Sequence, residues 1–190
     1  MFGKMVIRRV LAAAALFVAT LATAETGVTD GSVVIGQSVP LSGPAQELGI
    51  ETQLGAKLYF DHINSQGGVN GRKIKLLTLD DGYEPDRATA NTKQLIDKDD
   101  VFALFGYVGT PTSLAALKVS NPAGVPFVGA FTGAEALRTP FNRLIFNVRA
   151  SYNDETEKIV EQFTSLNVKR IAVFYQNDAY GNAGLTGVEK

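Results

Sequence analysis

The sequence predicts an α/β fold with a doubly wound, mostly parallel sheet, because short apolar runs alternate with helical patterns from residue 32 onwards. The runs over 32–39 and 73–80 have the length and composition of strands, and a helical pattern over 50–65 separates them. Strands separated by single helices favour parallel pairing in a doubly wound sheet. The strands are apolar on both faces, which is typical of a sheet covered by helices on both sides.

The predicted helix over 50–65 carries an apolar stripe. Ile50, Leu54, Leu58 and His62 recur at every fourth position, with charged residues between them. We therefore expect these residues to lie on one helix face. Because His62 is the only histidine and lies on this stripe, we assign it a core or surface role rather than a catalytic one.

The same alternation continues along the chain. Gly67-Gly68 ends the first helix, and Asn70-Gly71 supplies a turn before the next strand. The next predicted elements are a helix over 85–97, a strand over 101–105, a helix over 112–119, and strands over 126–130 and 144–148.

A further helix–strand–helix pattern begins near residue 153. Asn153 suits a helix N-cap, and acidic residues fill the first turn, where the helix dipole favours negative charge. The run over 169–175 predicts a strand, and a last helix begins near Ala179. The apolar face of the helix after residue 153 consists of Ile159, Val160, Phe163 and Leu166.

The first 24 residues have the three-part pattern of a secretory signal. Basic residues precede an uncharged apolar run of 12 residues over 10–21, and Ala22-Thr23-Ala24 forms a small-x-small cleavage site. The run is too short for a membrane span, which needs about 20 residues. We expect export, with Glu25 as the mature N-terminus and the periplasm as the destination. Simple secretion and an uncleaved anchor are the alternatives.

Composition excludes several classes of function. Removing the three basic residues of the leader takes the formal net charge from −1 to −4, which does not indicate a nucleic-acid partner. The chain has no cysteine, so it has no lipid-attachment site at the cleavage point and no thiol nucleophile. With no Walker loop and no dinucleotide-binding fingerprint, we expect no enzyme activity, no cofactor and no metal site. Asp80-Asp81 is interpreted as a turn with solvated acids, with metal binding as the alternative.

Two polar, glycine-containing loops follow neighbouring predicted strands. The loop over 106–113 contains Tyr107 and leads into a helix with Thr110 as N-cap and Pro111 at the first helical position. Free N–H groups at such a helix start, with nearby hydroxyls, suit a small carboxylate. An ordinary capped helix is the alternative. The loop over 129–133 follows the next strand and should lie on the same edge of the sheet.

These loops belong to a recognisable series of motifs. The chain contains Pro40-Leu41-Ser42-Gly43-Pro44, then Gly67-Gly68-Val69-Asn70-Gly71-Arg72, Asp80-Asp81, the loop over 106–113, and Tyr175-Gln176-Asn177-Asp178-Ala179-Tyr180-Gly181. In this order, they resemble the periplasmic leucine/isoleucine/valine-binding protein family. These are type I binding proteins that serve ABC importers of branched-chain amino acids and amides. The resemblance covers residues 33–190.

The resemblance implies two α/β lobes with a solute bound between them. Residues 25–147 would form the first lobe, and residues 148–190 the start of a second lobe that is incomplete, in a fragment or a truncated gene. The implied partners are a small solute, an amino acid or an amide-like molecule, and the membrane permease and ATPase complex of an ABC importer. A ligand-sensing module of a signalling receptor with the same fold is the alternative.

The resemblance also implies site residues. Thr110 matches the hydroxyl residue that meets the solute carboxylate, and the carbonyl of Phe131 matches the acceptor for the solute ammonium. Gly133 stands where a second hydroxyl is expected, so Thr132 is its substitute. The remaining candidates are Leu48 in place of a first-loop aromatic, Tyr180 as the cover of the solute, and Tyr152 and Tyr107 as further ligand-binding residues.

Overall fold

The computed structural model describes residues 25–190. The secretory signal predicted over 1–24 lies outside the described residues. Within the described part of the chain, no helix combines the length and the apolar character that crossing a bilayer requires.

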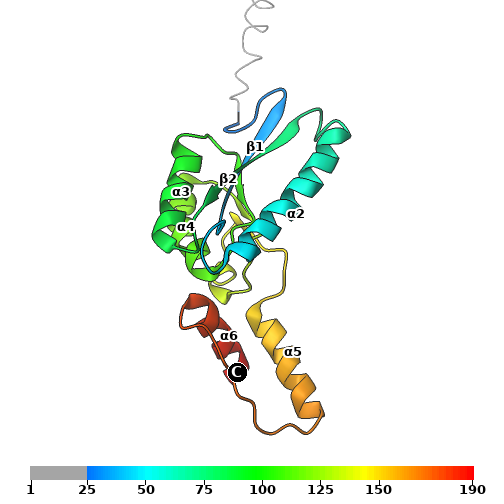
Figure 1. Ribbon diagram of the computed structural model, residues 1–190, viewed down its shortest axis with the longest axis vertical. Coiled ribbons are helices and arrows are strands. Elements are labelled where there is room, and N and C mark those ends of the chain that lie inside the picture. Colours follow the sequence, from blue (N-terminus) through cyan, green and yellow to red (C-terminus); the bar gives the residue numbers. More distant parts are fainter. Residues whose placement is uncertain (1–24) are drawn as a thin grey trace, which may run out of the picture.

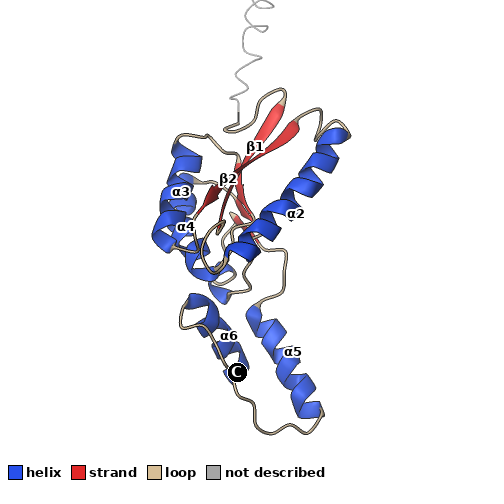
Figure 2. Ribbon diagram, in the orientation of Figure 1, coloured by secondary structure: helices blue, strands red, loops and turns tan. Residues whose placement is uncertain are grey.

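A five-stranded sheet has the strand order β2-β1-β3-β4-β5. Its strands are drawn in red in Figure 2, where β1 and β2 are labelled. Every neighbouring pair of strands is parallel. The chain passes outward from β1 to β2 and then returns across β1 to β3, so the direction of winding reverses between β1 and β3. The predicted doubly wound α/β fold is therefore confirmed. The strands are β1 (Ser32–Val39), β2 (Lys73–Asp80), β3 (Ala103–Phe105), β4 (Phe127–Val128) and β5 (Ile145–Phe146).

Helices lie on both faces of this sheet (Figure 1). α2 (Gln46–Ser65) covers one face, whereas α3 (Pro85–Asp97) and α4 (Thr110–Ala123) pack against each other on the opposite face. The two faces are needed because parallel crossover connections are right-handed and the chain reverses its direction of travel after β2. The carboxyl ends of the strands consequently form one edge, and ligands bind at this edge in open α/β sheets.

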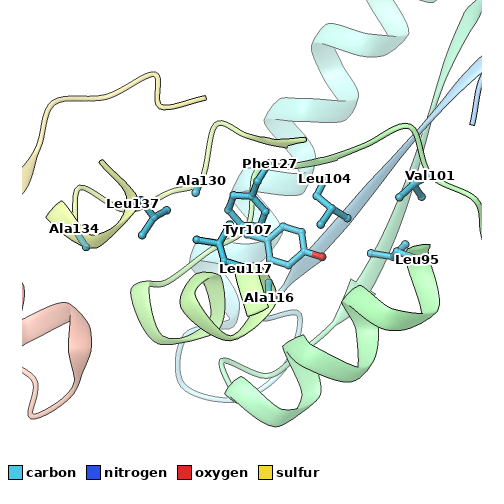
Figure 3. Close-up of a cluster of buried hydrophobic side chains, with 10 residues drawn as sticks. All are labelled: Leu95, Val101, Leu104, Tyr107, Ala116, Leu117, Phe127, Ala130, Ala134 and Leu137. Atoms are coloured by element: carbon cyan, nitrogen blue, oxygen red, sulfur yellow. The ribbon is translucent and has the colours of Figure 1, made fainter. Parts of the chain in front are cut away.

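The hydrophobic core lies between the central strands and helices α3 and α4 (Figure 3). Tyr107 and Phe127 are fully buried there, with ring centroids 4.9 Å apart. The Tyr107 hydroxyl lies 2.9 Å from the hydroxyl oxygen of Thr92, so its polar end is satisfied inside the core. Fully burying one large apolar side chain contributes about 1.5–3 kcal/mol to stability.

The apolar stripe predicted for the first helix lies on an exposed face of α2. Leu54 and Leu58 are exposed, Leu58 by 73%, and His62 is exposed and contacts the Gln66 side chain at 3.2 Å. The face towards the sheet instead carries small residues and Phe60, whose ring lies 5.4 Å from that of Phe105.

The last described region contains two helices, α5 (Tyr152–Ser165) and α6 (Ala179–Glu189), which pack against each other. The N-cap of α5 is Ser151 and not Asn153. The Ser151 hydroxyl accepts from the Asp154 amide at 3.0 Å, and the Asp154 carboxylate accepts from the Ser151 amide at 3.1 Å. This reciprocal pair is a capping box.

The strand predicted over 169–175 is also wrong for this structure. These residues are exposed, Phe174 by 105%, and they form no strand in the described chain. A strand forms only through backbone hydrogen bonds with a neighbouring strand, and residues 25–190 place no such neighbour beside this segment.

The 3₁₀ turn over Glu135–Leu137 is an element that the sequence did not indicate.

Candidate functional site

A cleft of about 960 Å³ lies between the carboxyl edge of the sheet and the pair α5 and α6. The sheet side is formed by the loops after β1, β2, β3 and β4, and the opposite side by residues of both helices and the segment before α6. Clefts of this size hold small molecules. The principal side chains and loops on its wall are Leu48, Tyr83, Val108-Gly109, Phe131, Arg149, Tyr152, Tyr175 and Tyr180.

Four of the predicted site residues line this cleft: Leu48, Phe131, Tyr152 and Tyr180. The rings of Tyr152 and Tyr180 meet edge to face, with centroids 5.6 Å apart. Aromatic pairs favour this geometry. Tyr152 follows the crossover from the sheet, whereas Tyr180 belongs to the first turn of α6, so the contact joins two segments of the cleft wall.

The two predicted hydroxyl residues meet each other and not the cleft. The hydroxyl oxygens of Thr110 and Thr132 lie 2.6 Å apart, and the side chains are 1% and 0% exposed. Thr132 also accepts from the Ala134 amide at 3.2 Å. The structure thus brings the two loops together as the sequence analysis expected, but it covers both hydroxyls. Gly109 is the N-cap of α4, in place of the predicted Thr110.

Gly133 has a steric role beneath Tyr152. A β-carbon on Gly133 would lie 2.7 Å from Cδ1 of the Tyr152 ring, which is closer than real contacts. The Gly133 carbonyl also accepts from the Tyr152 amide at 2.7 Å. Glycine therefore lets the crossover segment rest directly on the loop after β4, and Tyr152 covers the place where the resemblance implied a hydroxyl.

Tyr107 was predicted to bind the ligand, but it does not line the cleft. Its side chain is buried in the core against Phe127 (Figure 3). Its hydroxyl lies 2.9 Å from that of Thr92. The alternation of side chains along the extended segment explains this placement: after β3, Tyr107 turns to the core, while Val108 lines the cleft.

Tyr83 is a cleft residue that the sequence analysis missed. It has a positive φ of 68°, and a β-carbon on Gly109 would lie 2.5 Å from its ring. Burial raises the pKa of Tyr83 to about 12, with a further rise from the charge of Asp178 and an opposing effect of a hydrogen bond with Gln176. The phenol is therefore a neutral hydrogen-bonding group at physiological pH. Its place just after the carboxyl end of β2 was the available signal.

The pair Asp80 and Asp81 holds Tyr83 and the neighbouring loops in place. Asp81 is buried and accepts from the Ser38 hydroxyl at 2.7 Å and the Tyr83 amide at 2.9 Å. Burial raises the pKa of Asp81 above its usual value. The expectation of two solvated acids is therefore wrong for Asp81. Among residues 25–190, no group of three or more His, Cys, Asp or Glu side chains is placed to hold a metal ion.

Asp80 differs from its neighbour in electrostatics. Burial acts to raise its pKa, but several hydrogen bonds together hold the pKa well below the usual range. The donors are the Ser42 hydroxyl, the Leu41 and Gly82 amides, and the Arg87 guanidinium. Asp80 therefore stays ionised and ties the loop after β1 to the loop after β2.

Arg149 is the second cleft residue that the sequence analysis missed. Its guanidinium carbon lies 5.6 Å from the ring centroid of Phe131 and 5.1 Å from that of Tyr152. It also forms an ion pair with Glu155 on α5. Because Arg149 lies in an irregular segment between β5 and α5, no helical or strand periodicity marked it.

Comparisons with known proteins agree with this architecture. The family profile described as periplasmic binding protein matches residues 32–190. An amino acid binding protein of Pseudomonas aeruginosa is 31% identical over 152 residues, which are 78% of this chain and 40% of the relative. The Leu/Ile/Val-binding protein homolog 7 of Brucella abortus is 28% identical, over 88% of this chain and 45% of the relative.

Structural similarity extends the match. The crystal structure of a possible leucine/isoleucine/valine-binding protein from Rhodopirellula baltica is 39% identical and superimposes with a TM-score of 0.80. The matched region covers 88% of this chain and 45% of that protein. The chain thus spans less than half the length of these relatives.

Proposed function

Because the chain belongs to the periplasmic binding protein family, we propose that it is the solute-binding component of an ABC importer. It captures an amino acid or a related small carboxylate or amide in the cleft between the sheet and α5–α6. The observation that carries this proposal is the cleft itself, since the strand-end loops and the helices of the following region together line one cleft of about 960 Å³. The proposal assigns the chain no catalytic step.

The character of the cleft wall supports a small solute with an apolar part. Phe131, Tyr152 and Tyr180 present partly exposed aromatic surface, and Tyr83 adds a neutral hydroxyl. Apolar walls with a few placed polar groups are typical of small-molecule sites. Delivery of the solute to a permease and ATPase complex follows from the transport role that we propose.

The same proposal places the protein in the periplasm, as its family relatives are described. Export through the predicted signal would leave Glu25 at the mature N-terminus. N-terminal sequencing of the exported protein measures this directly, and a retained Met1 would contradict it.

Solute capture is tested by calorimetric titration of the protein expressed from its complete gene. The panel contains amino acids, their amides and simple carboxylates. We expect one class to bind, and Tyr180→Ala to weaken the best ligand by about tenfold through loss of aromatic packing. Tyr59→Ala is the matched control, because Tyr59 is an exposed tyrosine on α2 outside the cleft. No binding across the panel, or an unchanged affinity in Tyr180→Ala, would count against the proposed site.

A further inference from the structure

The wall of the cleft carries few charged side chains. Among the described residues of its wall, Arg149 alone is cationic, while Glu84 and Glu155 are acidic. A carboxylate entering the cleft therefore has one side chain with which it can form an ion pair. The planar guanidinium suits this task, because its parallel N–H groups match the two oxygens of a carboxylate.

The hydroxyl groups do not compete for this role. Thr110 and Thr132 are engaged with each other, and Tyr152 lies over Gly133 in the same loop. Both threonines are buried, so a solute would reach these hydroxyls only after the loops that bury them had rearranged. Arg149 needs no such rearrangement, because it already lies on the wall with a side chain that is 30% exposed.

The backbone of Arg149 is held in place by a second arginine. Arg138 donates from Nη2 to the carbonyl oxygens of Arg149 at 2.8 Å and Ala150 at 3.1 Å, and from Nη1 to that of Ala134 at 3.1 Å. This clamp fastens the crossover segment to the loop after β4. The guanidinium of Arg149 is then steadied by the rings of Phe131 and Tyr152. Such prior ordering reduces the entropy lost on binding.

The ion pair with Glu155 leaves part of the guanidinium free. Nε and Nη2 of Arg149 donate to the same carboxylate oxygen, Oε1 of Glu155. Within residues 25–190, Nη1 donates to no acceptor. Both partners are partly exposed, so a solute carboxylate can add to Nη1 or replace Glu155.

We propose that Arg149 is the residue that recognises the carboxylate of the solute, with Glu155 as the exchangeable counterion, and that the solute carries this carboxylate on an apolar body packed against Phe131, Tyr152 and Tyr180. This inference rests on the proposed function and names its substrate class. Glu155 weakens binding by competing for Arg149, so its removal strengthens the complex. A merely structural ion pair would behave in the opposite way, because loss of Glu155 would loosen the cleft wall.

The test compares carboxylates with their amides in the protein expressed from its complete gene. The probe pairs are L-leucine with L-leucinamide, and 3-phenylpropanoate with 3-phenylpropanamide. The wild type is expected to prefer the carboxylate of the better pair by about tenfold or more, as hydrogen bonds to charged groups predict. Arg149→Met should abolish this preference, Arg149→Lys should keep part of it, and Glu155→Gln should raise carboxylate affinity several-fold, about threefold or more.

Arg143→Met is the matched control, because Arg143 is exposed and lies outside the cleft. Thermal unfolding of each variant checks that the fold is retained. A carboxylate preference that survives Arg149→Met would overturn the inference and leave the proposed function intact. Weaker carboxylate binding in Glu155→Gln would overturn the exchange of partners. If neither pair nor any other probe of the panel binds the wild type, the proposed function and this inference fall together.

Discussion

The sheet region over 32–146 and the helical region over 152–190 treat similar apolar sequences in opposite ways. The run over 101–105 contains the largely buried strand β3 (Ala103–Phe105), whereas the run over 169–175 forms no strand and is exposed. α4 buries six residues, whereas α5 buries none despite its well-defined apolar face. The difference shows that an apolar pattern indicates which face of a segment can be buried. Whether that face is buried depends on what the rest of the chain packs against it.

The largest expected contrast between the two regions is in backbone hydrogen exchange. In residues 25–190, the segment over 169–175 donates no backbone hydrogen bond, so its amides should exchange close to the rate of an unstructured peptide. β1 pairs with β2 along its whole length and with β3 at Ile35 and Gly36, so its hydrogen-bonded amides should exchange about 10³-fold more slowly. Exchange mass spectrometry measures both. Equal protection in the two segments would remove the contrast.

Two phenylalanines provide the next largest contrast, in stability. Phe127→Ala should lower the free energy of unfolding by about 3–5 kcal/mol, because it opens a cavity against Tyr107 in the core. Phe174→Ala should change it by less than about 0.5 kcal/mol, because the Phe174 side chain has no cover. Urea unfolding of both variants gives the comparison. A large loss in Phe174→Ala would show that the exposed segment packs in solution.

Two glycines test the crossover between the regions. Gly133→Ala should destabilise the protein by about 1–3 kcal/mol, because the new methyl group would overlap the Tyr152 ring. Gly184→Ala in α6 meets no atom within 4 Å and should gain up to about 1 kcal/mol from helix propensity. Thermal unfolding distinguishes them. Equal behaviour would mean that Tyr152 does not rest on the loop after β4.

The smallest expected contrast is between neighbouring acids in the dependence of stability on pH. Burial raises the pKa of Asp81 above its usual value of 3.8, so the contribution of Asp81 to stability is fully present below pH 3.8 and is lost as the pH rises through the folded-state pKa. The pKa of Asp80 is lowered by its hydrogen bonds, so the contribution of Asp80 to stability is present above pH 3.8 and is lost as the pH falls through the folded-state pKa. Asp81→Asn and Asp80→Asn should therefore flatten opposite limbs of the stability profile. The same limb flattening in both variants would contradict the assignment.

Much of the cleft could be located from the sequence because strand ends are visible in it. Polar loops after two neighbouring strands pointed to the edge of the sheet where the cleft lies. The family resemblance supplied Leu48, Phe131, Tyr152 and Tyr180, which all line the cleft. Tyr83 also follows a strand end, but the sequence analysis considered only the acidic pair Asp80-Asp81 at that position. Arg149 had no such signal, because its role depends on two rings and a carboxylate supplied by other segments.

The sequence by itself determined the parallel α/β alternation, because hydrophobic periodicity and turn residues act within a few positions of the chain. Tertiary structure alone decided which stripe of α2 faces the sheet, that Tyr107 turns into the core and that Thr110 and Thr132 bond to each other. It also decided that residues 169–175 form no strand in the described chain. These outcomes depend on contacts between distant segments. Where the local sequence permits a side chain to face either of two environments, the segment that packs against it decides between them. That segment lies far away in the sequence, so the local pattern does not contain it.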